Sequence, residues 1–374
     1  MPRKHTIQIL SGTTAQILAD IPARNELVLN TDNYSLRVGD GTTPGGRLIA
    51  DPSTATVIER APKRFLITDT SISNTQLKIK QGTVLTLGDL VFSSLNSDYS
   101  FDPTAILDTG STLTNGANYY LYLVSTDNAT TSLVCSLNAT TPAGTYTNYK
   151  QIGGFHTLCV SVGTITGHPL SDYVAGQILP ASVWCLNHWA KHQAGMVYDD
   201  ITDCWAGIYN MNTSGLSEYN TSRANNLQHF QFVELARAND MELLSDDEFY
   251  SFSKGSNQKT PVQGSAQPNP DTTGGRVDTA NRRMISWLGC EEMCGLQWQH
   301  LRPTSAAGGS NWNNQNGDEG SFYGSAMVLL AGGNWSSSSY CGSRCRYAIS
   351  SLSFANSSCG ARGRSQAFHT WKTE

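Results

Sequence analysis

Cysteine is the residue type in this chain whose spacing suggests the most chemistry. The chain has nine cysteines, and two pairs, Cys290 with Cys294 and Cys341 with Cys345, are each spaced four residues apart. Closely spaced thiolates are frequent zinc ligands, so the two pairs resemble two halves of a zinc site. Free buried cysteine is also common in proteins made in the cytosol. The sequence therefore favours unpaired thiols and predicts no bound metal.

A second candidate site combines histidines and aspartates. His188 and His192 are four residues apart, and Asp199, Asp200 and Asp203 follow shortly after. Two histidines at that spacing on a helix are able to share a metal ion. No glutamate follows in the pattern of a metal-dependent hydrolase, so we interpret the group as structural or surface-exposed.

Adjacent carboxylates form the third candidate site. Glu291 and Glu292 offer a pair for acid–base chemistry, or oxygen ligands for calcium as in sugar-binding lectins. The plainer interpretation is a structural role. A calcium-dependent lectin also needs a converging set of Glu, Asn and Asp residues, and the sequence does not identify one. We therefore predict no catalytic residue and no cofactor.

The charge and hydropathy of the chain exclude several classes of protein. Its 374 residues carry a formal net charge of −5, which gives no basic face for binding phosphates, so a polymerase or nuclease is not expected. No apolar run reaches about eighteen residues, the length that would span a membrane. The N-terminus is basic but lacks the apolar region of a signal peptide, so synthesis in the cytoplasm without ordinary secretion is expected.

The elements that must position these residues divide the chain into three segments. All eight tryptophans lie at or after Trp184, and seven of the nine cysteines lie at or after Cys185. Such a step in composition indicates a boundary between architectures, and we place it near His168 and Pro169, where proline interrupts the strand pattern. The predicted domains are 1–52, 53–167 and 168–374.

The first two segments show strand patterns. In 1–52, apolar residues alternate with polar ones, and a tight-turn signal follows; the residues concerned are Ile7, Ile9, Leu27, Leu29, Leu36, Val38 and the turn pair Asp40-Gly41. A unit this small needs a partner chain for stability. In 53–167, the clearest strands are 65–67, 119–124 and 158–162, separated by Gly, Asn, Ser and Thr turns, which favours a β-sandwich.

The third segment mixes helices with loops and is expected to be α+β. Residues 228–239 carry apolar side chains at helical spacing. Ser245 and Glu248 form a capping-box pattern, with Leu244 and Phe249 as a hydrophobic staple, which predicts a helix start. Long irregular loops are predicted at 254–275 and 305–324, and such loops on a rigid frame are typical of binding modules.

This third segment resembles two relatives of the C-type lectin fold. The resemblance is carried by residues 285–298 (ISWLGCEEMCGLQW), 331–335 (AGGNW), 342–344 (GSR) and 360–363 (GARG). One relative is the formylglycine-generating, sulfatase-modifying enzyme family. The other is the family of variable proteins of diversity-generating retroelements, of the phage major tropism determinant type.

Chemistry separates the two families. The oxidising enzyme needs a thiol a few residues past its Gly-Gly pair and a second cysteine nearby, because a thiolate performs the reaction. Here residues 336–339 are all serine and only Cys341 lies close. The enzyme interpretation therefore lacks its nucleophile pair, and we predict that the chain is not an enzyme.

The retroelement resemblance implies a variable, ligand-contacting region at 332–363. Mutagenesis in that family alters adenines, chiefly in asparagine codons, and twelve residues here are reachable in that way: Asn334, Ser336, Ser337, Ser338, Tyr340, Tyr347, Ile349, Ser350, Phe354, Asn356, Ser358 and Cys359. Seven others are expected to form a fixed structural frame: Trp298, Gly333, Trp335, Gly342, Arg344, Gly360 and Arg362. Tyrosine with serine and asparagine suits adaptable contact, as in antibody loops. A serine-rich surface loop without any partner is the plainer alternative.

The other two segments extend the resemblance. Residues 7–14, 25–32 and 37–43 look like the small β-prism at the start of tail fibre proteins, and 151–156 (QIGGFH) resembles the end of the family's middle domain. The chain departs from the family in insertions around 254–275 and 303–320. The resemblance thus implies a β-prism that anchors to the virion, a middle β-sandwich and a lectin-like receptor-binding domain.

The function expected from this resemblance is that of a homotrimeric phage tail receptor-binding protein. Its partners would be a host-cell surface protein or glycan and other tail proteins, with no nucleic acid and no membrane insertion. The protein would reside at the tail tip of the virion after release by lysis. The alternatives are the sulfatase-modifying oxidase and a bacterial surface-displayed protein diversified by the same mechanism, which would need a secretion signal.

Overall fold

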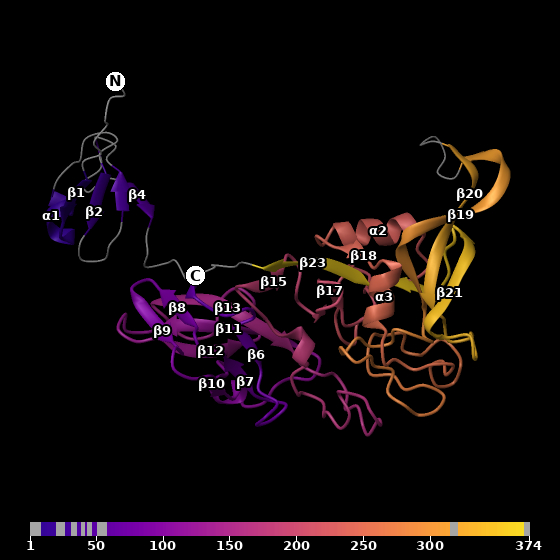
Figure 1. The fold of residues 1–374 in the computed structure, drawn as a ribbon, viewed down its shortest axis with the longest axis horizontal. Coiled ribbons are helices and arrows are strands. Elements are labelled where there is room, and N and C mark those ends of the chain that lie inside the picture. The colour runs from indigo at the N-terminus through magenta and orange to yellow at the C-terminus, as the bar shows by residue number, and fades with distance from the viewer. Residues whose placement is uncertain are drawn as a thin grey trace.

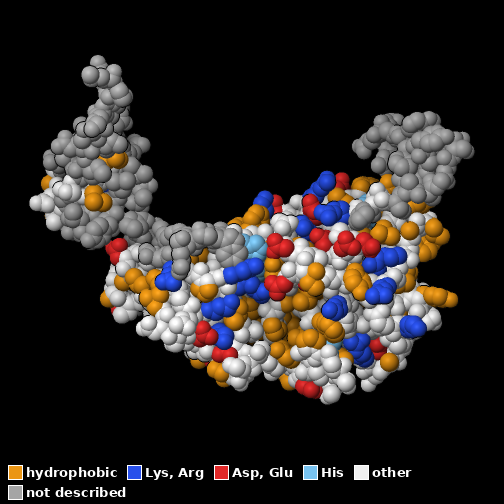
Figure 2. Space-filling model, in the orientation of Figure 1, with side chains coloured by type: hydrophobic (Ala, Val, Ile, Leu, Met, Phe, Trp, Pro, Cys, Tyr) orange, Lys and Arg blue, Asp and Glu red, His pale blue; other side chains and the backbone are white. Residues whose placement is uncertain are grey.

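The computed structural model describes most of the chain: residues 9–19, 27–30, 36–38, 42, 47–50, 58–314 and 321–369. Within these residues, strands predominate and only three α-helices occur. No helix among them is long and apolar enough to cross a membrane. Figure 2 shows basic and acidic side chains interspersed over the face in view, without a single large field of one sign.

The N-terminal unit is a four-stranded sheet with one helix. The strands lie side by side in chain order: β1 (Ile9–Gly12), β2 (Leu27–Asn30), β3 (Leu36–Val38) and β4 (Arg47–Ala50). β1 and β2 are parallel, and the other neighbouring pairs are antiparallel. The strands predicted at Ile9, Leu27, Leu29, Leu36 and Val38 are confirmed. Ile7 and the Asp40-Gly41 turn lie outside the described residues.

Helix α1 (Thr14–Ala19) joins β1 to β2, and the sequence analysis missed it. Its start has a local cause, because the backbone N–H and hydroxyl of Thr13 donate to the side chain of Gln16, 2.9 and 3.1 Å away. The backbone N–H of Gln16 donates back to the Thr13 hydroxyl at 3.4 Å. This reciprocal pattern is a capping box, a signal available in the sequence.

The middle segment consists of three sheets that share one core. Two are three-stranded, and the third begins a larger sheet; the strands are β5 (Ile58–Arg60), β8 (Val84–Leu87) and β9 (Leu90–Ser93), then β6 (Leu66–Thr68), β7 (Leu77–Ile79) and β10 (Tyr99–Phe101), then β11 (Asn118–Ser125), β12 (Ser132–Ser136) and β13 (Asn148–His156). All three sheets contribute side chains to the same buried cluster, which includes Leu77, Leu85, Leu121 and Ile152. Short 3-10 helices span Pro103–Ile106 and Pro180–Ser182.

The predicted strand at 158–162 is wrong. Leu158 and Val162 donate backbone hydrogen bonds to the carbonyls of Gln177 and Tyr173, at 2.8 and 2.9 Å, within a looped segment that contains no strand. Leu158 and the adjacent Cys159 are both buried, so the apolar run serves the core without strand alternation. The last strand of the middle segment is β13, which ends before this run.

One large sheet links the middle and C-terminal segments. Its order is β12-β11-β13-β14-β15-β23-β17-β16, with β18 also paired to β23; the new strands are β14 (Trp184–Cys185), β15 (His188–Ala190), β16 (Met196–Asp199), β17 (Cys204–Gly207), β18 (Glu242–Leu243) and β23 (Gly363–His369). β13 pairs with β14 through Gly154 and Trp184. The predicted boundary at 167–168 thus lies in the segment between two hydrogen-bonded strands, and the C-terminal strand returns to the centre of the sheet.

The two predicted C-terminal helices are confirmed. Helix α2 (His229–Arg237) buries Phe232 and Ala236 on one face. Helix α3 (Asp246–Phe252) is capped by Ser245, which accepts a hydrogen bond from the Glu248 backbone while Glu248 accepts one from the Ser245 backbone. The long segment 254–275 is irregular, as predicted.

A four-stranded sheet carries the region singled out in the sequence. Its order is β21-β20-β19-β22, with bounds β19 (Trp298–Asn314), β20 (Ser321–Gly332), β21 (Gly342–Ser351) and β22 (Cys359–Ala361). The loop predicted at 305–324 is wrong where it is described, because 305–314 and 321–324 belong to an antiparallel hairpin whose far end projects from the body (Figure 1). The Gly- and Asn-rich composition hid this pairing, which backbone hydrogen bonds hold with two irregularities of register.

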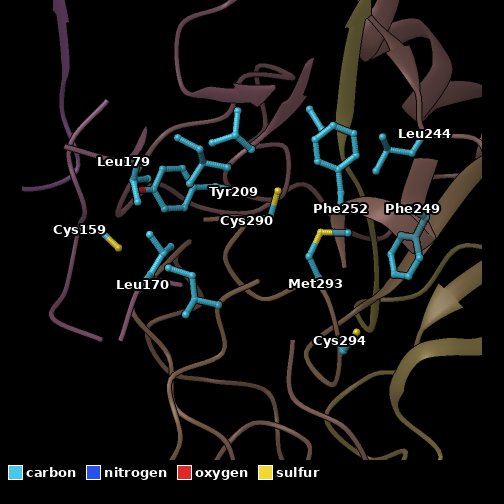
Figure 3. Close-up of a cluster of buried hydrophobic side chains, with 14 of the residues drawn as sticks. Cys159, Leu170, Leu179, Tyr209, Leu244, Phe249, Phe252, Cys290, Met293 and Cys294 are labelled. Carbon is cyan, nitrogen blue, oxygen red and sulfur yellow. The ribbon is translucent and has the colours of Figure 1, made fainter. Parts of the chain in front are cut away.

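The core of the lectin-like segment packs beneath this sheet. Tyr209, Phe249 and Met293 lie in one cluster of buried side chains (Figure 3). Cys290 lies beside Tyr209 in that cluster, and Cys294 lies at a different part of it, near Phe249. The four-residue spacing of these two cysteines therefore reflects core packing in a loop segment.

Candidate binding face

The region 332–363 begins with a glycine pair that the backbone requires. Gly333 has φ +82, and a Cβ atom there would lie 2.6 Å from the Cβ of Cys341. Gly360 has an equally close neighbour, because a Cβ there would meet the side-chain oxygen of Gln297 at 2.6 Å. Gly333 is thus a position that disfavours any side chain, whereas a side chain at Gly360 would require Gln297 to move.

Arg362 is the centre of the frame. Its side chain is almost fully buried, and its guanidinium donates to the carbonyls of Gly207 and Glu291, at 2.5 and 2.6 Å, and to the side-chain oxygen of Asn210 at 3.0 Å. Burial lowers the pKa of this arginine, although the group keeps its charge at neutral pH. One side chain therefore ties the residue after β22 to the end of β17 and to two loop segments.

The frame tryptophans support the strand from below. Trp335 packs on the buried cluster of Val262, Met284 and Leu296, and its backbone N–H donates to the carbonyl of Leu296 at 3.1 Å. Trp298 is half-buried in β19, and its ring centroid lies 5.7 Å from that of Tyr347. The half-buried ring of Trp298 thus supports the exposed ring of Tyr347.

Three residues expected to contact a ligand are buried, which corrects that expectation. Cys359 is fully buried against Val328 and Leu330, and Ser350 is 7% exposed where β21 pairs with β20. Asn334 is 9% exposed, and its side-chain oxygen accepts hydrogen bonds from the Ser336 backbone and the Ser337 hydroxyl. Asn334 therefore shapes the turn, and none of the three side chains lies on the surface.

The other nine positions are exposed or half-buried and lie on β21 and the turns that flank it. We call these nine residues the variable face: Ser336, Ser337, Ser338, Tyr340, Tyr347, Ile349, Phe354, Asn356 and Ser358. Tyr340 and Ile349 are 77% and 72% exposed, and Tyr347 is 41% exposed. Large apolar side chains left in solvent on a rigid strand mark a surface for contact with a partner.

Two residues at this surface have roles that the sequence did not indicate. Arg344, predicted as frame, is exposed, and its guanidinium lies 5.4 Å from the ring centroid of Tyr250 on α3. It also donates to the Tyr250 hydroxyl at 3.0 Å, and this hydrogen bond lowers the pKa of the tyrosine. Gly342, the remaining frame glycine, approaches the side chain of Gln258 so closely that a Cβ would clash. The sequence did not single out Tyr250, because this residue points outward from α3 and its partner Arg344 is 94 positions away in the chain.

The thiols near the face are not activated for catalysis. Burial raises the pKa of Cys341 to about 11, and burial also raises the pKa of Cys345. A thiol nucleophile needs the opposite shift, because only the thiolate reacts. Both shifts disfavour the thiolate that the oxidising enzyme would use.

The carboxylate pair serves the core. Glu291 accepts a hydrogen bond from the guanidinium of Arg283 at 2.6 Å, with both side chains buried. Glu292 is also buried, it forms a long ion pair with Arg276 at 3.9 Å, and burial raises the pKa of its carboxyl although Arg223 opposes that shift. Each glutamate thus faces a different arginine, which fits a structural role.

The histidine pair does not have the helical geometry that its spacing allowed. His188 lies in strand β15, where its ring stacks on that of His369 with centroids 5.2 Å apart. Its pKa is lowered to about 3 by burial. Among the residues that the structure describes, no group of three or more His, Cys, Asp or Glu side chains is arranged to hold a metal ion.

Together, the fold and the face define a β-rich protein with a C-type lectin-like architecture that presents an exposed strand on a buried frame. Comparisons with known proteins agree. Residues 67–185 match the family model of the Mtd second domain. The chain is 26% identical to the tail fiber receptor-binding protein of Bordetella phage BPP-1, over 96% of this chain and 97% of that protein.

Solved structures give the same result. The U1 and M1 variants of the Major Tropism Determinant superpose with a TM-score of 0.71 at 24% identity, and the match covers 97% and 98% of this chain and all of theirs. The chain is therefore similar to the major tropism determinants along nearly its whole length, which confirms the resemblance inferred from its sequence.

Proposed function

We propose that this chain is the receptor-binding protein of a phage tail and that the variable face contacts the host-cell receptor. The observation that carries the proposal is the joint presence of a full-length likeness to a tail fiber receptor-binding protein and an exposed strand, β21, that carries Tyr347 and Ile349. The protein acts by binding, and its relatives are receptor-binding proteins.

The composition of the variable face suits this role. Tyr340, Tyr347 and Ile349 supply large contact area, and the serines and Asn356 add small polar groups that adapt their hydrogen bonds to the partner. Aromatic residues in the centre of an interface commonly carry most of the binding energy. The partner is a protein or a glycan of the host surface.

The remaining segments position the face. We interpret 1–52 as a β-prism unit that attaches the protein to the tail, and 53–167 as a β-sandwich that spaces the lectin-like domain from it. The protein works as a homotrimer at the tail tip of the virion, made in the host cytoplasm. Three linked faces raise weak single-site affinity through effective concentration.

The variable face is diversified by a retroelement. The frame glycines and Arg362 fix the backbone, so side chains on β21 are exchanged without altering it. Sequencing the DNA downstream of the gene tests this: a near-copy of the segment for 332–363, differing mainly at adenines, is expected. The absence of such a copy and of a neighbouring reverse transcriptase would refute diversification while leaving receptor binding intact.

A cell-binding assay tests the receptor role. Labelled full-length protein is expected to bind cells of the host strain saturably, and Ile349→Asp should abolish binding because it places a charge in the apolar centre of the face. Ile201→Asp is the control, since Ile201 is an isoleucine of similar exposure, 77% against 72% for Ile349, in the turn between β16 and β17. Equal binding by Ile349→Asp and the unaltered protein would show that the face does not contact the receptor.

A further inference from the structure

A second candidate site lies in the large sheet, away from the variable face. A groove of about 550 Å³ crosses four neighbouring strands, β11, β13, β14 and β15, and the segments next to them. Its volume lies in the range usual for small-ligand sites, roughly 300–1,000 Å³. The lining consists mostly of aromatic and amide side chains: Tyr122, Thr140, Tyr149, Lys150, Gln151, Trp184, Leu186, Trp189 and Gln193.

The aromatic floor is built by the strand pairing. Tyr122 and Gln151 are register partners on β11 and β13, so their side chains leave the same side of the sheet. Trp184 pairs with Gly154, where any Cβ would lie 2.7 Å from the indole nitrogen, so the glycine is what admits the ring. Trp189 stacks on Phe368 of β23, with ring centroids 4.9 Å apart. The rings are therefore held rigidly before any ligand arrives.

Polar groups line the same groove. The side-chain oxygen of Gln193 is buried and has no hydrogen-bond partner among the described residues. The amide nitrogen of Gln151 donates to the Ala139 carbonyl at 2.9 Å and to the Tyr122 hydroxyl at 3.3 Å, which fixes the orientation of this amide. Gln193 therefore places an acceptor without a partner in the wall of the groove.

We propose that this groove binds a short uncharged oligosaccharide. The apolar C–H face of a sugar ring packs on aromatic rings such as Trp189 and Tyr149, and sugar hydroxyls donate to amide oxygens such as that of Gln193. Among the residues that the structure describes, no carboxylate lines the groove, and the one cation in the lining, Lys150, is exposed. The site stands on the groove alone and does not depend on the role of the variable face.

Binding of the full-length protein to an array of neutral and acidic bacterial surface oligosaccharides tests the proposal, followed by titration with the best free oligosaccharide. Gln193→Met removes the unpartnered acceptor at similar length, and it should weaken neutral-glycan binding about tenfold, as the loss of one hydrogen bond does. Its melting temperature should equal or exceed that of the unaltered protein. Tyr149→Ala, at the rim, should weaken binding as well.

Two controls separate this site from others. Tyr99→Ala removes an aromatic of comparable exposure, 47% against 41% for Tyr149, and should bind the glycan normally. Ile349→Asp, on the variable face, should also bind it normally, so failure of either site is distinguishable from failure of the other. The proposal is overturned if no glycan binds, if only acidic glycans bind, or if Gln193→Met and Tyr149→Ala bind as the unaltered protein does.

Discussion

At the scale of single residues, the frame depends on charges and hydrogen bonds placed deep in the core. Arg362 donates to four acceptors, on Gly207, Asn210, Glu291 and Gln299, and each would be left without this donor if the guanidinium were removed. Arg344 is chemically identical but exposed, and it contacts only the hydroxyl and ring of Tyr250. Burial, and not residue type, decides what each arginine contributes.

Replacing Arg362 by methionine should therefore lower the free energy of unfolding by at least about 3 kcal/mol, because buried acceptors of a charged group lose their donor. Arg344→Met is the matched control and should cost less than about 1 kcal/mol. Denaturant unfolding monitored by tryptophan fluorescence measures both. Equal losses in the two variants would contradict the frame as described.

Buried histidines predict how stability depends on pH. Burial lowers the pKa of His300 to about 3, and neither ring nitrogen has a hydrogen-bond partner among the described residues. The unfolded chain binds a proton near pH 6.5 but the folded chain does not, so stability falls as pH drops from about 6.5 toward 3, by up to about 1.4 kcal/mol per pH unit.

His300→Phe should remove that one proton from the acid dependence without lowering stability at pH 7, because the ring packs beside Phe232 at 5.0 Å and loses no hydrogen bond. Unfolding free energies measured from pH 7 to pH 4 should give a shallower slope in the variant. Parallel profiles for the two proteins would show that His300 takes up a proton in the folded state.

At the scale of elements, α3 links the core to the variable face. Asp246 at its first turn pairs with Arg346 of β21, and Tyr250 contacts Arg344 of the same strand. The start of the helix depends on Ser245. The position of β21 is therefore coupled to the capping of this short helix.

Ser245→Ala should cost about 1 kcal/mol of stability, the usual effect of removing an N-cap side chain. Ser251→Ala, within the same helix, removes a hydroxyl without removing the cap and should change stability by less than about 0.5 kcal/mol. Thermal unfolding measures the stabilities, and hydrogen exchange should show faster exchange in α3 only for Ser245→Ala. Unchanged exchange in that variant would refute the capping role.

Local signals explain which elements were predictable. The capping box of Ser245 and Glu248 predicted the start of α3, and the helical spacing of Phe232 and Ala236 predicted α2. Strand β13 was missed because its first residues, Asn148 to Gln151, are polar, and partners on both sides hold it. The apolar run 158–162 suggested a strand but packs as a loop. Pairings between distant segments, such as β15 with β23, leave no local pattern.

The candidate site was predictable to a similar degree. The motif glycines and Arg362 indicated the frame. Where a backbone has little room for a side chain, or where a buried guanidinium holds several acceptors, few other residue types fit. Burial of Asn334, Ser350 and Cys359 was not visible, since serine, asparagine and cysteine occur both inside and outside proteins. The groove of Trp184 and Trp189 was missed because its residues come together only through the pairing of four strands.

At the scale of the whole molecule, the protein is expected to assemble from several copies of the chain. The N-terminal unit is small and its four strands are short, so contacts from other copies are expected to stabilise it. Sedimentation equilibrium of the full-length protein should give three times the chain mass of 40.5 kDa. A mass equal to one chain at micromolar concentration would contradict the trimer and, with it, the role of avidity.

The central claim is that a rigid frame carries an exchangeable binding face, and a library tests it most directly. The nine positions of the variable face are randomised together in the full-length protein, and members are sorted for folding and for binding to a panel of bacterial strains. We predict that most members fold with melting temperatures near the original and that different members bind different strains. If most members unfold, the face does not tolerate exchange. If all members keep the original strain preference, the face does not determine what the protein binds.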